Sequence, residues 1–237
     1  MADRTVAILG FHKIGPPPAG GWESWFYVSE HRFAGFLADL KDDGWEVIDL
    51  ERFLRALATP ETLPTRSALL TFDDGYSSMR RVTLPLLRCF EVPAVLFVPT
   101  DYVGGRNTFD AGAEPDEPIC DWDDLRELAR GGVSIQSHAA SHRRFSELSA
   151  REREEEVVRS KEVLEEHLGT PCRVIAFPYG DPGPSDDPGA LVIAGYEAAF
   201  LYGGSAVGLP IANRYRVQRV AMGPNTDLAA ELRNGRE

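Results

Sequence analysis

The sequence is short of the features that mark several large classes of protein. Its 237 residues include only three cysteines, Cys89, Cys120 and Cys172, which lie far apart and form no CxxC pair. This spacing argues against a disulfide framework and against a zinc–thiolate site. We expect Cys89 and Cys172 to be inert core residues. No apolar run approaches the roughly 20 residues that a membrane-spanning helix needs, so we expect no transmembrane segment.

Positive charge is also scarce. The 25 Lys and Arg residues are outnumbered by 37 Asp and Glu residues, which gives a formal net charge of −12. An acidic surface repels nucleic acid and anionic lipid, so we expect neither as a partner. The first residues lack the basic stretch, apolar core and cleavage site of a secretory signal, which predicts a cytoplasmic location. The sequence leaves the oligomeric state open.

The chain does contain a regular alternation of short apolar runs and helix-like segments. A hydrophobic fraction of 43% over this length suits one sizeable core. We predict helices between strands, a last helix from about residue 226, and strands at residues 6–11, 47–50, 68–72, 94–98, 133–136, 173–177, 198–201 and 216–221. Such alternation predicts a parallel sheet with helices outside it, closed or nearly closed into a barrel. The alternative is a doubly wound open sheet, for which the chain lacks a GxGxxG fingerprint.

Two helices have clear sequence boundaries. Asp121 can cap a helix from residue 122 to residue 130. Ser149-x-x-Glu152 is a capping box for a long helix that we expect to end at Leu168, with Gly169 after it.

Unusual polar residues fall at the carboxyl ends of the predicted strands. His12 follows the first strand, Asp73 and Asp74 follow the third, His138 follows the fifth, and residues 178–180 follow the sixth. In a β/α barrel these ends share one face, where catalytic groups collect. We therefore expect these side chains to converge on one site.

A metal site is one chemistry that these residues could support. His138 and His142 are four residues apart, so both imidazoles can reach one ion if the segment is helical or turned. With one carboxylate of the Asp73–Asp74 pair they form a mixed nitrogen and oxygen set suited to Zn²⁺, with Co, Ni or Mn as alternatives. A second carboxylate could take the proton of a metal-activated water. The alternatives are a pair of surface histidines and an ordinary strand-to-helix turn with capping acids.

Three motifs in order carry a family resemblance. Thr71-Phe-Asp-Asp-Gly-Tyr76, His138-x-x-x-His142 and Phe177-Pro-Tyr-Gly180 resemble those of the polysaccharide deacetylase family, also called the NodB-homology domain or carbohydrate esterase family 4. The resemblance covers nearly the whole chain. The segments VAILGFHKIG and CDWDDLREL resemble those of family members related to the poly-N-acetylglucosamine deacetylases. The resemblance implies a distorted (β/α) barrel of about seven parallel strands, with residues 1–237 forming a single catalytic domain.

The resemblance also implies roles for the motif residues. It makes Asp73 the general base, and it makes three residues the metal ligands, namely Asp74, His138 and His142.

The third motif would serve the oxyanion and the substrate. The backbone N–H of Tyr179, which follows Pro178, would help to hold the developing oxyanion. Tyr76 would line the pocket, or alternatively pack under the aspartate turn.

The sequence departs from the family pattern in two places. Ala176 stands where many members carry an arginine that orients the base, and Arg219 resembles an arginine of the relatives that lack it. We expect Arg219 to hold Asp73 ionised and aligned, the alternative being an exposed arginine at a strand end. The late histidine that acts as general acid in many members is absent, since none follows His167. We expect His12 to protonate the leaving group instead, the alternative being a hydrogen-bonded structural histidine.

Together these features predict a metal-dependent deacetylase. Its substrate would be an N-acetylated sugar or glycoconjugate, and the loops at residues 101–120 and 181–188 would shape the pocket. One alternative is a catalytically degenerate glycan-binding domain of the same fold, which would bind metal without releasing acetate. Another is a hydrolase of a different non-peptide C–N bond, such as a cyclic amide, which product analysis would separate.

Overall fold

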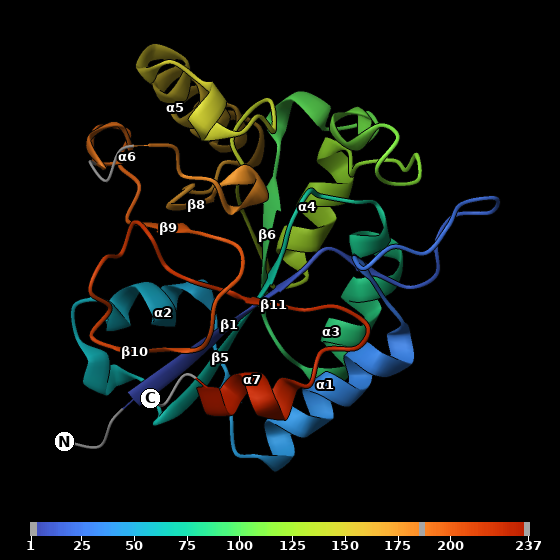
Figure 1. The fold of residues 1–237 in the computed structure, drawn as a ribbon, viewed down its shortest axis with the longest axis vertical. Coiled ribbons are helices and arrows are strands. Elements are labelled where there is room, and N and C mark those ends of the chain that lie inside the picture. The colour runs from blue at the N-terminus through green and yellow to red at the C-terminus, as the bar shows by residue number, and fades with distance from the viewer. Residues whose placement is uncertain (1–3, 185–187, 235–237) are drawn as a thin grey trace.

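A curled sheet forms the centre of the computed structural model, which describes residues 4–184 and 188–234 (Figure 1). Six strands follow one another as parallel neighbours, in the order β1 (Arg4–Phe11), β5 (Arg66–Phe72), β6 (Ala94–Val98), β7 (Val133–Ser137), β8 (Val174–Ala176) and β9 (Ala198–Phe200). Their carboxyl ends therefore lie at one edge of the sheet, where the polar residues singled out above emerge.

Shorter strands complete this sheet. β4 (Glu46–Val47) pairs in parallel with β5, β11 (Val220–Ala221) pairs in parallel with β1, and β10 (Val207–Leu209) pairs antiparallel with β1. The chain that leads into β11 also bonds to β9, since the N–H of Val217 donates to the carbonyl of Ala199 at 2.9 Å. This segment links β9 to β1, so the sheet curls into a distorted β/α barrel. The predicted fold class is confirmed, with β10 as an antiparallel addition that the sequence pattern did not predict.

Helices connect the strands and cover the sheet. The longer ones are α1 (Glu30–Asp42), α4 (Trp122–Arg130) and α5 (Ala150–Leu168). The shorter ones are α2 (Leu50–Ala56), α3 (Leu84–Phe90), α6 (Gly189–Ile193) and α7 (Leu228–Asn234). A separate two-stranded sheet pairs β2 (Lys13–Ile14) with β3 (Tyr27–Val28). No helix within the described ranges combines the length and the apolar character needed to cross a bilayer.

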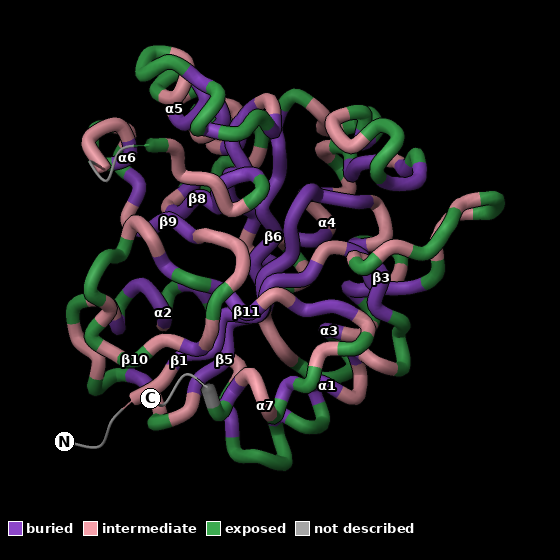
Figure 2. Tube along the Cα trace, viewed as in Figure 1, coloured by how far each residue is buried: buried purple, intermediate pink, exposed green. Residues whose placement is uncertain are grey.

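Apolar side chains pack on both faces of the central sheet. In β1, Ala7 and Leu9 contact the cluster beneath the outer helices, whereas Val6 and Ile8 contact a second cluster inside the curl. This alternation follows the two-residue period of a strand. The central strands are buried over most of their length, as the purple parts of Figure 2 show. Burial on both faces explains why these strands read as continuous apolar runs in the sequence.

Both predicted helix boundaries are confirmed. Asp121 caps α4 by accepting a hydrogen bond from the N–H of Asp124 at 2.8 Å. Ser149 and Glu152 form the predicted capping box of α5, and Gly169 ends that helix in the left-handed conformation with φ 66°. These local caps set the first and last residues of α5. The helix packs against the turn that carries His138 and His142.

The predicted strand at residues 47–50 is wrong in its second half. The strand ends at Val47, and Leu50 is the first residue of α2. The reason is a helix cap, because the carboxylate of Asp49 accepts a hydrogen bond from the N–H of Arg52 at 2.7 Å.

Four further expectations concern a strand, a cysteine and two loops. The segment 216–221 forms a regular strand only at Val220–Ala221. Cys89 is exposed, so it is not the core residue that we expected. The loop 101–120 has no α-helix or strand but contains two short 3₁₀ turns, Thr100–Tyr102 and Thr108–Asp110. Residues 185–187 of the predicted loop 181–188 lie outside the described residues.

Candidate active site

One cavity of about 330 Å³ opens at the carboxyl ends of the strands. Seven of the nine predicted site residues line it, namely His12, Asp73, Asp74, Tyr76, His138, His142 and Tyr179. The remaining two, Arg219 and Pro178, are buried and are not among the described residues that line the cavity. The predicted convergence of residues from distant parts of the chain is therefore observed.

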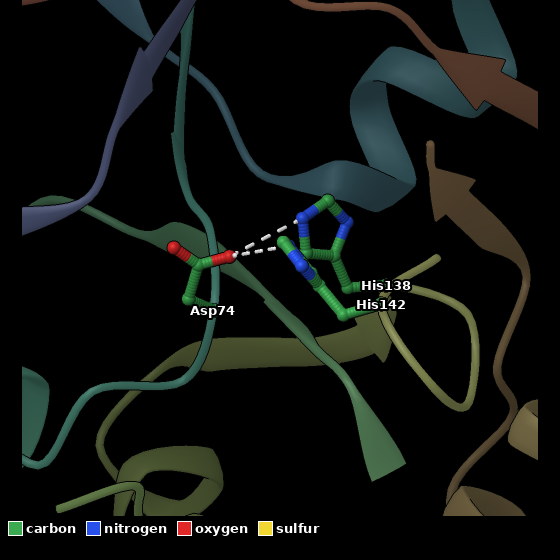
Figure 3. Close-up of side chains that lie close together, drawn as sticks. All are labelled: Asp74, His138 and His142. Carbon is green, nitrogen blue, oxygen red and sulfur yellow. Dashed lines mark ion pairs between the residues drawn. The ribbon is translucent and has the colours of Figure 1, made fainter. Parts of the chain in front are cut away.

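Three buried residues at this cavity meet as a cation site would require. The Oδ1 atom of Asp74 lies 3.1 Å from Nε2 of His142 and 3.4 Å from Nε2 of His138, as the dashed lines of Figure 3 show. One ligand atom from each residue lies within 4.8 Å of the others. Two ligands about 2.1 Å from a tetrahedral Zn²⁺ would lie about 3.4 Å apart, which matches these distances.

Residues with positive φ values set the directions of these side chains. Asp74 has φ 71° and the following Gly75 has φ 73°, which turns the chain sharply as it leaves β5. Ala139 and His142 also have positive φ values, of 61° and 57°. Such conformations are strained for residues with a Cβ atom, and they cluster at functional sites. The His138–His142 segment is thus a turn, one of the two arrangements that the spacing allowed.

Two atoms of the cluster lack a partner in the described part of the chain. No hydrogen bond reaches Oδ1 of Asp74 or Nδ1 of His142, although both atoms are buried. Buried polar atoms normally have a partner, so an orphaned carboxylate oxygen that faces two imidazoles fits a bound cation. His138 is already oriented, because its Nδ1 lies 2.8 Å from the carbonyl oxygen of Ala176. That contact leaves Nε2 available as a ligand.

The electrostatics keep Asp74 ionised. Burial by itself would raise the pKa of Asp74, but the adjacent His138 and His142 hold it well below its ordinary value. The residues present therefore fit a divalent cation in both geometry and charge.

Asp73 has a different set of contacts. Its two carboxylate oxygens accept hydrogen bonds from Nη1 and Nη2 of Arg219, each at 2.7 Å. The guanidinium is fully buried, and it also donates to the carbonyl of Leu201 at 2.7 Å and to the hydroxyl of Thr71 at 3.1 Å. Burial would raise the pKa of Asp73, but the charge of Arg219 and those of the neighbouring histidines lower it. Arg219 is thus placed where the sequence expected it, against Asp73 and away from solvent.

His12 lies on the other side of the cavity. Its Nε2 is 3.9 Å from Oδ2 of Asp74, and its Nδ1 is 3.5 Å from the hydroxyl of Tyr202. The ring of Phe26 packs 4.4 Å from the imidazole. Burial lowers the pKa of His12 more than the charges of Asp74 and Asp73 raise it. Burial thus favours the neutral form of this imidazole.

The third motif forms a short 3₁₀ turn, Pro178–Gly180, after β8. Pro178 is buried at the first position of this turn. Tyr179 has φ 58°, and its half-exposed ring packs 4.8 Å from the ring of His142 and 4.1 Å from the guanidinium of Arg144. The turn thus places Tyr179 beside the candidate metal ligands.

Tyr76 lines the cavity, which is one of the two alternatives that the sequence left open. Its side chain is only 1% exposed and packs beneath the ammonium of Lys13, 4.4 Å from the ring centre. Its hydroxyl lies 3.5 Å from Oδ2 of Asp110.

Sequence reasoning missed several residues of the cavity wall. Asp110 and Glu114 come from the loop 101–120, which was expected to shape the pocket without any residue being singled out. Lys13 could have pointed to these acidic residues, because a lysine inside the apolar segment FHKIG needs a partner of opposite charge. Its ammonium is buried 2.8 Å from Glu114 and 3.2 Å from Glu117.

The loop 181–188 does not line this cavity in the part that the structure describes. Pro182 and Pro188 instead line a separate cavity of about 60 Å³ against α5 and α6. For the described residues, the expectation that this loop shapes the pocket is wrong.

Several known proteins are similar to this chain. Putative polysaccharide deacetylase YxkH of Bacillus subtilis (strain 168) is 22% identical over 175 residues, which are 74% of this chain and 57% of that protein. Poly-beta-1,6-N-acetyl-D-glucosamine N-deacetylase of Staphylococcus epidermidis (strain RP62A) is 23% identical over 207 residues, which are 82% of this chain and 68% of the relative. The solved structure of the Streptococcus pyogenes deacetylase PplD superposes with a TM-score of 0.81 at 22% identity, over 99% of both chains.

A family model places the chain among these proteins. The model described as polysaccharide deacetylase matches residues 61–192, which is more than half of the 237 residues. This match includes the Asp73–Asp74 turn, the histidine turn and the Pro178–Gly180 turn. The chain belongs to the polysaccharide deacetylase family.

Proposed function

We propose that this chain, acting as one catalytic domain over residues 1–237, is a metal-dependent hydrolase that removes the acetyl group of an N-acetylated sugar in a polysaccharide or glycoconjugate. The observation that supports this most strongly is the arrangement of the two adjacent aspartates. Asp74 meets two imidazoles at ligand-like distances, while Asp73 lines the same cavity as a separate, ionised carboxylate. The relatives named for poly-N-acetylglucosamine deacetylation support the choice of substrate class.

Asp74, His138 and His142 would hold the cation. The mixed oxygen and nitrogen donors favour Zn²⁺, with Co, Ni or Mn as alternatives. When bound, the cation polarises the acetyl carbonyl and lowers the pKa of a water toward about 7.

Asp73 would act as the general base. A base must be ionised before the reaction, and the pKa of Asp73 is held below its ordinary value by Arg219. The two-point contact with Arg219 also fixes the plane of the carboxylate. Arg219 would therefore orient the base without touching the substrate.

His12 and Tyr179 would serve the leaving group and the oxyanion. Burial favours the neutral form of the His12 imidazole. His12 would therefore have to take up a proton within the catalytic cycle before it donates that proton to the leaving amine. The backbone N–H of Tyr179 would donate a hydrogen bond to the developing oxyanion.

The experiment that tests this function is an acetate assay. Metal-loaded protein and its Asp73→Asn variant are incubated with a panel of acetylated sugars, and released acetate is measured. We expect release by the parent and a loss of about a hundredfold or more in the variant, which is the effect of a general base. Asp116→Asn, an exposed change on the loop 101–120, is the matched control and should retain full activity.

The same assay separates the alternatives. Equal activity in the parent and Asp73→Asn removes Asp73 from the role of base. A parent that binds metal but releases no acetate from any sugar favours a glycan-binding domain. Release of a product other than acetate favours hydrolysis of another C–N bond.

A further inference from the structure

A carboxylate outside the cavity holds the turn that carries the two histidines. Glu156 lies in α5 and is only 7% exposed. Its Oε2 accepts hydrogen bonds from the N–H groups of Ala140 and Ser141, both at 2.8 Å, and its Oε1 accepts from the Ser141 hydroxyl at 2.5 Å. These three bonds bind the middle of the His138–His142 turn to the helix.

A second residue on the same face of α5 holds the start of this turn. Ser160 lies four residues after Glu156, so the two side chains share one side of the helix. Its hydroxyl is 2.7 Å from that of Ser137, the last residue of β7. The Ser137 hydroxyl in turn accepts a hydrogen bond from the N–H of Ala139 at 3.1 Å. One face of α5 therefore contacts both the strand end and the turn.

The turn needs such support because its backbone is strained. Ala139 and His142 both have positive φ values, which residues with a Cβ atom adopt only where the surroundings impose the conformation. Without Glu156, two buried N–H groups of the turn would lose their acceptor, and the turn could relax to a conformation in which the imidazoles diverge.

Glu156 is not among the described residues that line the cavity, so it acts only through the turn. We propose that Glu156 is a positioning residue that sets the geometry of the His138 and His142 ligands and thereby the affinity for the metal. This inference rests on the proposed metal site. Loss of a partner that orients a metal ligand typically weakens metal binding about 10- to 100-fold.

Three substitutions separate geometry from charge. Glu156→Gln keeps an oxygen at the same reach for the two N–H groups and loses the charge. Glu156→Asp keeps the charge, but its side chain is one methylene too short to reach the turn. Glu156→Ala removes both. Glu154→Ala, an exposed change on the same helix, is the matched control.

The test is a titration of metal-free protein with Zn²⁺ or Co²⁺, followed by calorimetry and, for Co²⁺, by the visible spectrum. We expect Glu156→Asp and Glu156→Ala to bind about 10- to 100-fold more weakly than the parent and to show an altered Co²⁺ spectrum. Glu156→Gln and Glu154→Ala should stay close to the parent in both readouts.

The remaining outcomes also decide for or against the inference. If Glu156→Asp binds like the parent while Glu156→Gln is weakened, the charge matters and the geometry does not. Parental affinity in both Glu156→Asp and Glu156→Ala overturns the inference and leaves the metal site intact. If Glu156→Ala does not fold, the ranking of Gln against Asp still decides. A parent that binds no metal overturns the proposed function together with this inference.

Discussion

Two carboxylates that are neighbours in sequence have opposite environments in this molecule. Both oxygens of Asp73 are hydrogen-bonded to Arg219, so its charge is balanced by the chain itself. Oδ1 of Asp74 has no hydrogen-bond partner among the described residues and faces the Nε2 atoms of His138 and His142. Asp73 thus has its partners within the protein, whereas Asp74 has an oxygen that the proposed cation would satisfy.

The backbone at the end of β5 produces this difference. Asp73 continues the sheet ladder, since its N–H donates to the carbonyl of Phe11 at 2.9 Å. Asp74 and Gly75 then adopt positive φ values, so the second side chain leaves in a new direction. A single strained turn therefore sends one carboxylate to Arg219 and the other to the histidines.

The largest effect should follow from removing the Asp74 carboxylate. Asp74→Ala should abolish stoichiometric metal binding, because it removes the only oxygen donor of the three-residue set. Asp73→Asn should retain the metal, since Arg219 and not the cation balances Asp73. Metal content after dialysis against trace metal checks both variants. Full occupancy in Asp74→Ala would contradict the difference between the two environments.

Removing Arg219, the partner of Asp73, should instead lower the stability of the fold. Arg219→Met leaves the buried charge of Asp73 unpaired, which should lower the free energy of unfolding by about 3–5 kcal/mol, measured by urea denaturation. Adding Asp73→Asn to this variant should recover part of the loss. Arg106→Met breaks an exposed pair with Asp116 and should leave unfolding unchanged. Similar changes in the free energy of unfolding for Arg219→Met and Arg106→Met would show that the buried pair contributes no more to stability than the exposed pair.

Metal addition should stabilise the protein through the cluster that contains Asp74 and not through Asp73. A ligand at a hundred times its Kd stabilises the folded state by about 2.7 kcal/mol, so the thermal midpoint of the parent should rise on loading and fall on chelation. Asp73→Asn should show the same rise, whereas Asp74→Ala should show none. Differential scanning calorimetry with and without metal measures this, and a metal-induced rise in Asp74→Ala would place the ion elsewhere.

The smallest effect is a dependence on pH. The folded pKa of Asp73 lies below its value of about 3.9 in the unfolded chain, so the ionised form stabilises the fold above that pH. As the pH falls through the folded pKa, Asp73 takes up a proton and this contribution is lost. The stability advantage of the metal-free parent over Asp73→Asn should therefore be full at pH 7 and shrink in acid. Denaturation at several pH values checks this, and an advantage that grows in acid would reverse the sign.

Local signals in the sequence were sufficient for much of the fold and for locating the Asp74, His138 and His142 cluster. Ser149, Glu152 and Gly169 predicted the limits of α5, because caps depend on neighbouring residues. The Asp73–Asp74 and His138–His142 pairs were found because strand ends and residue spacing are both visible in the sequence.

Interactions between distant segments were beyond such reasoning. Strand β10 pairs with β1 across some two hundred residues, and nothing local marks its antiparallel direction. Lys13 meets Glu114 across 101 positions, so the sequence showed a lysine in an apolar segment without showing its partner. Glu156 lies in a helix rich in glutamates, and only the fold distinguishes it from its exposed neighbours.

The most direct test of the central claim is a crystal structure of the metal-soaked protein with anomalous scattering measured at the metal edge. We predict one ion within about 2.0–2.2 Å of an oxygen of Asp74 and of Nε2 of both His138 and His142, with Asp73 still bound to Arg219. An ion bound elsewhere, an ion coordinated by Asp73 in place of Asp74, or no ion at this cluster at saturating metal would contradict the account.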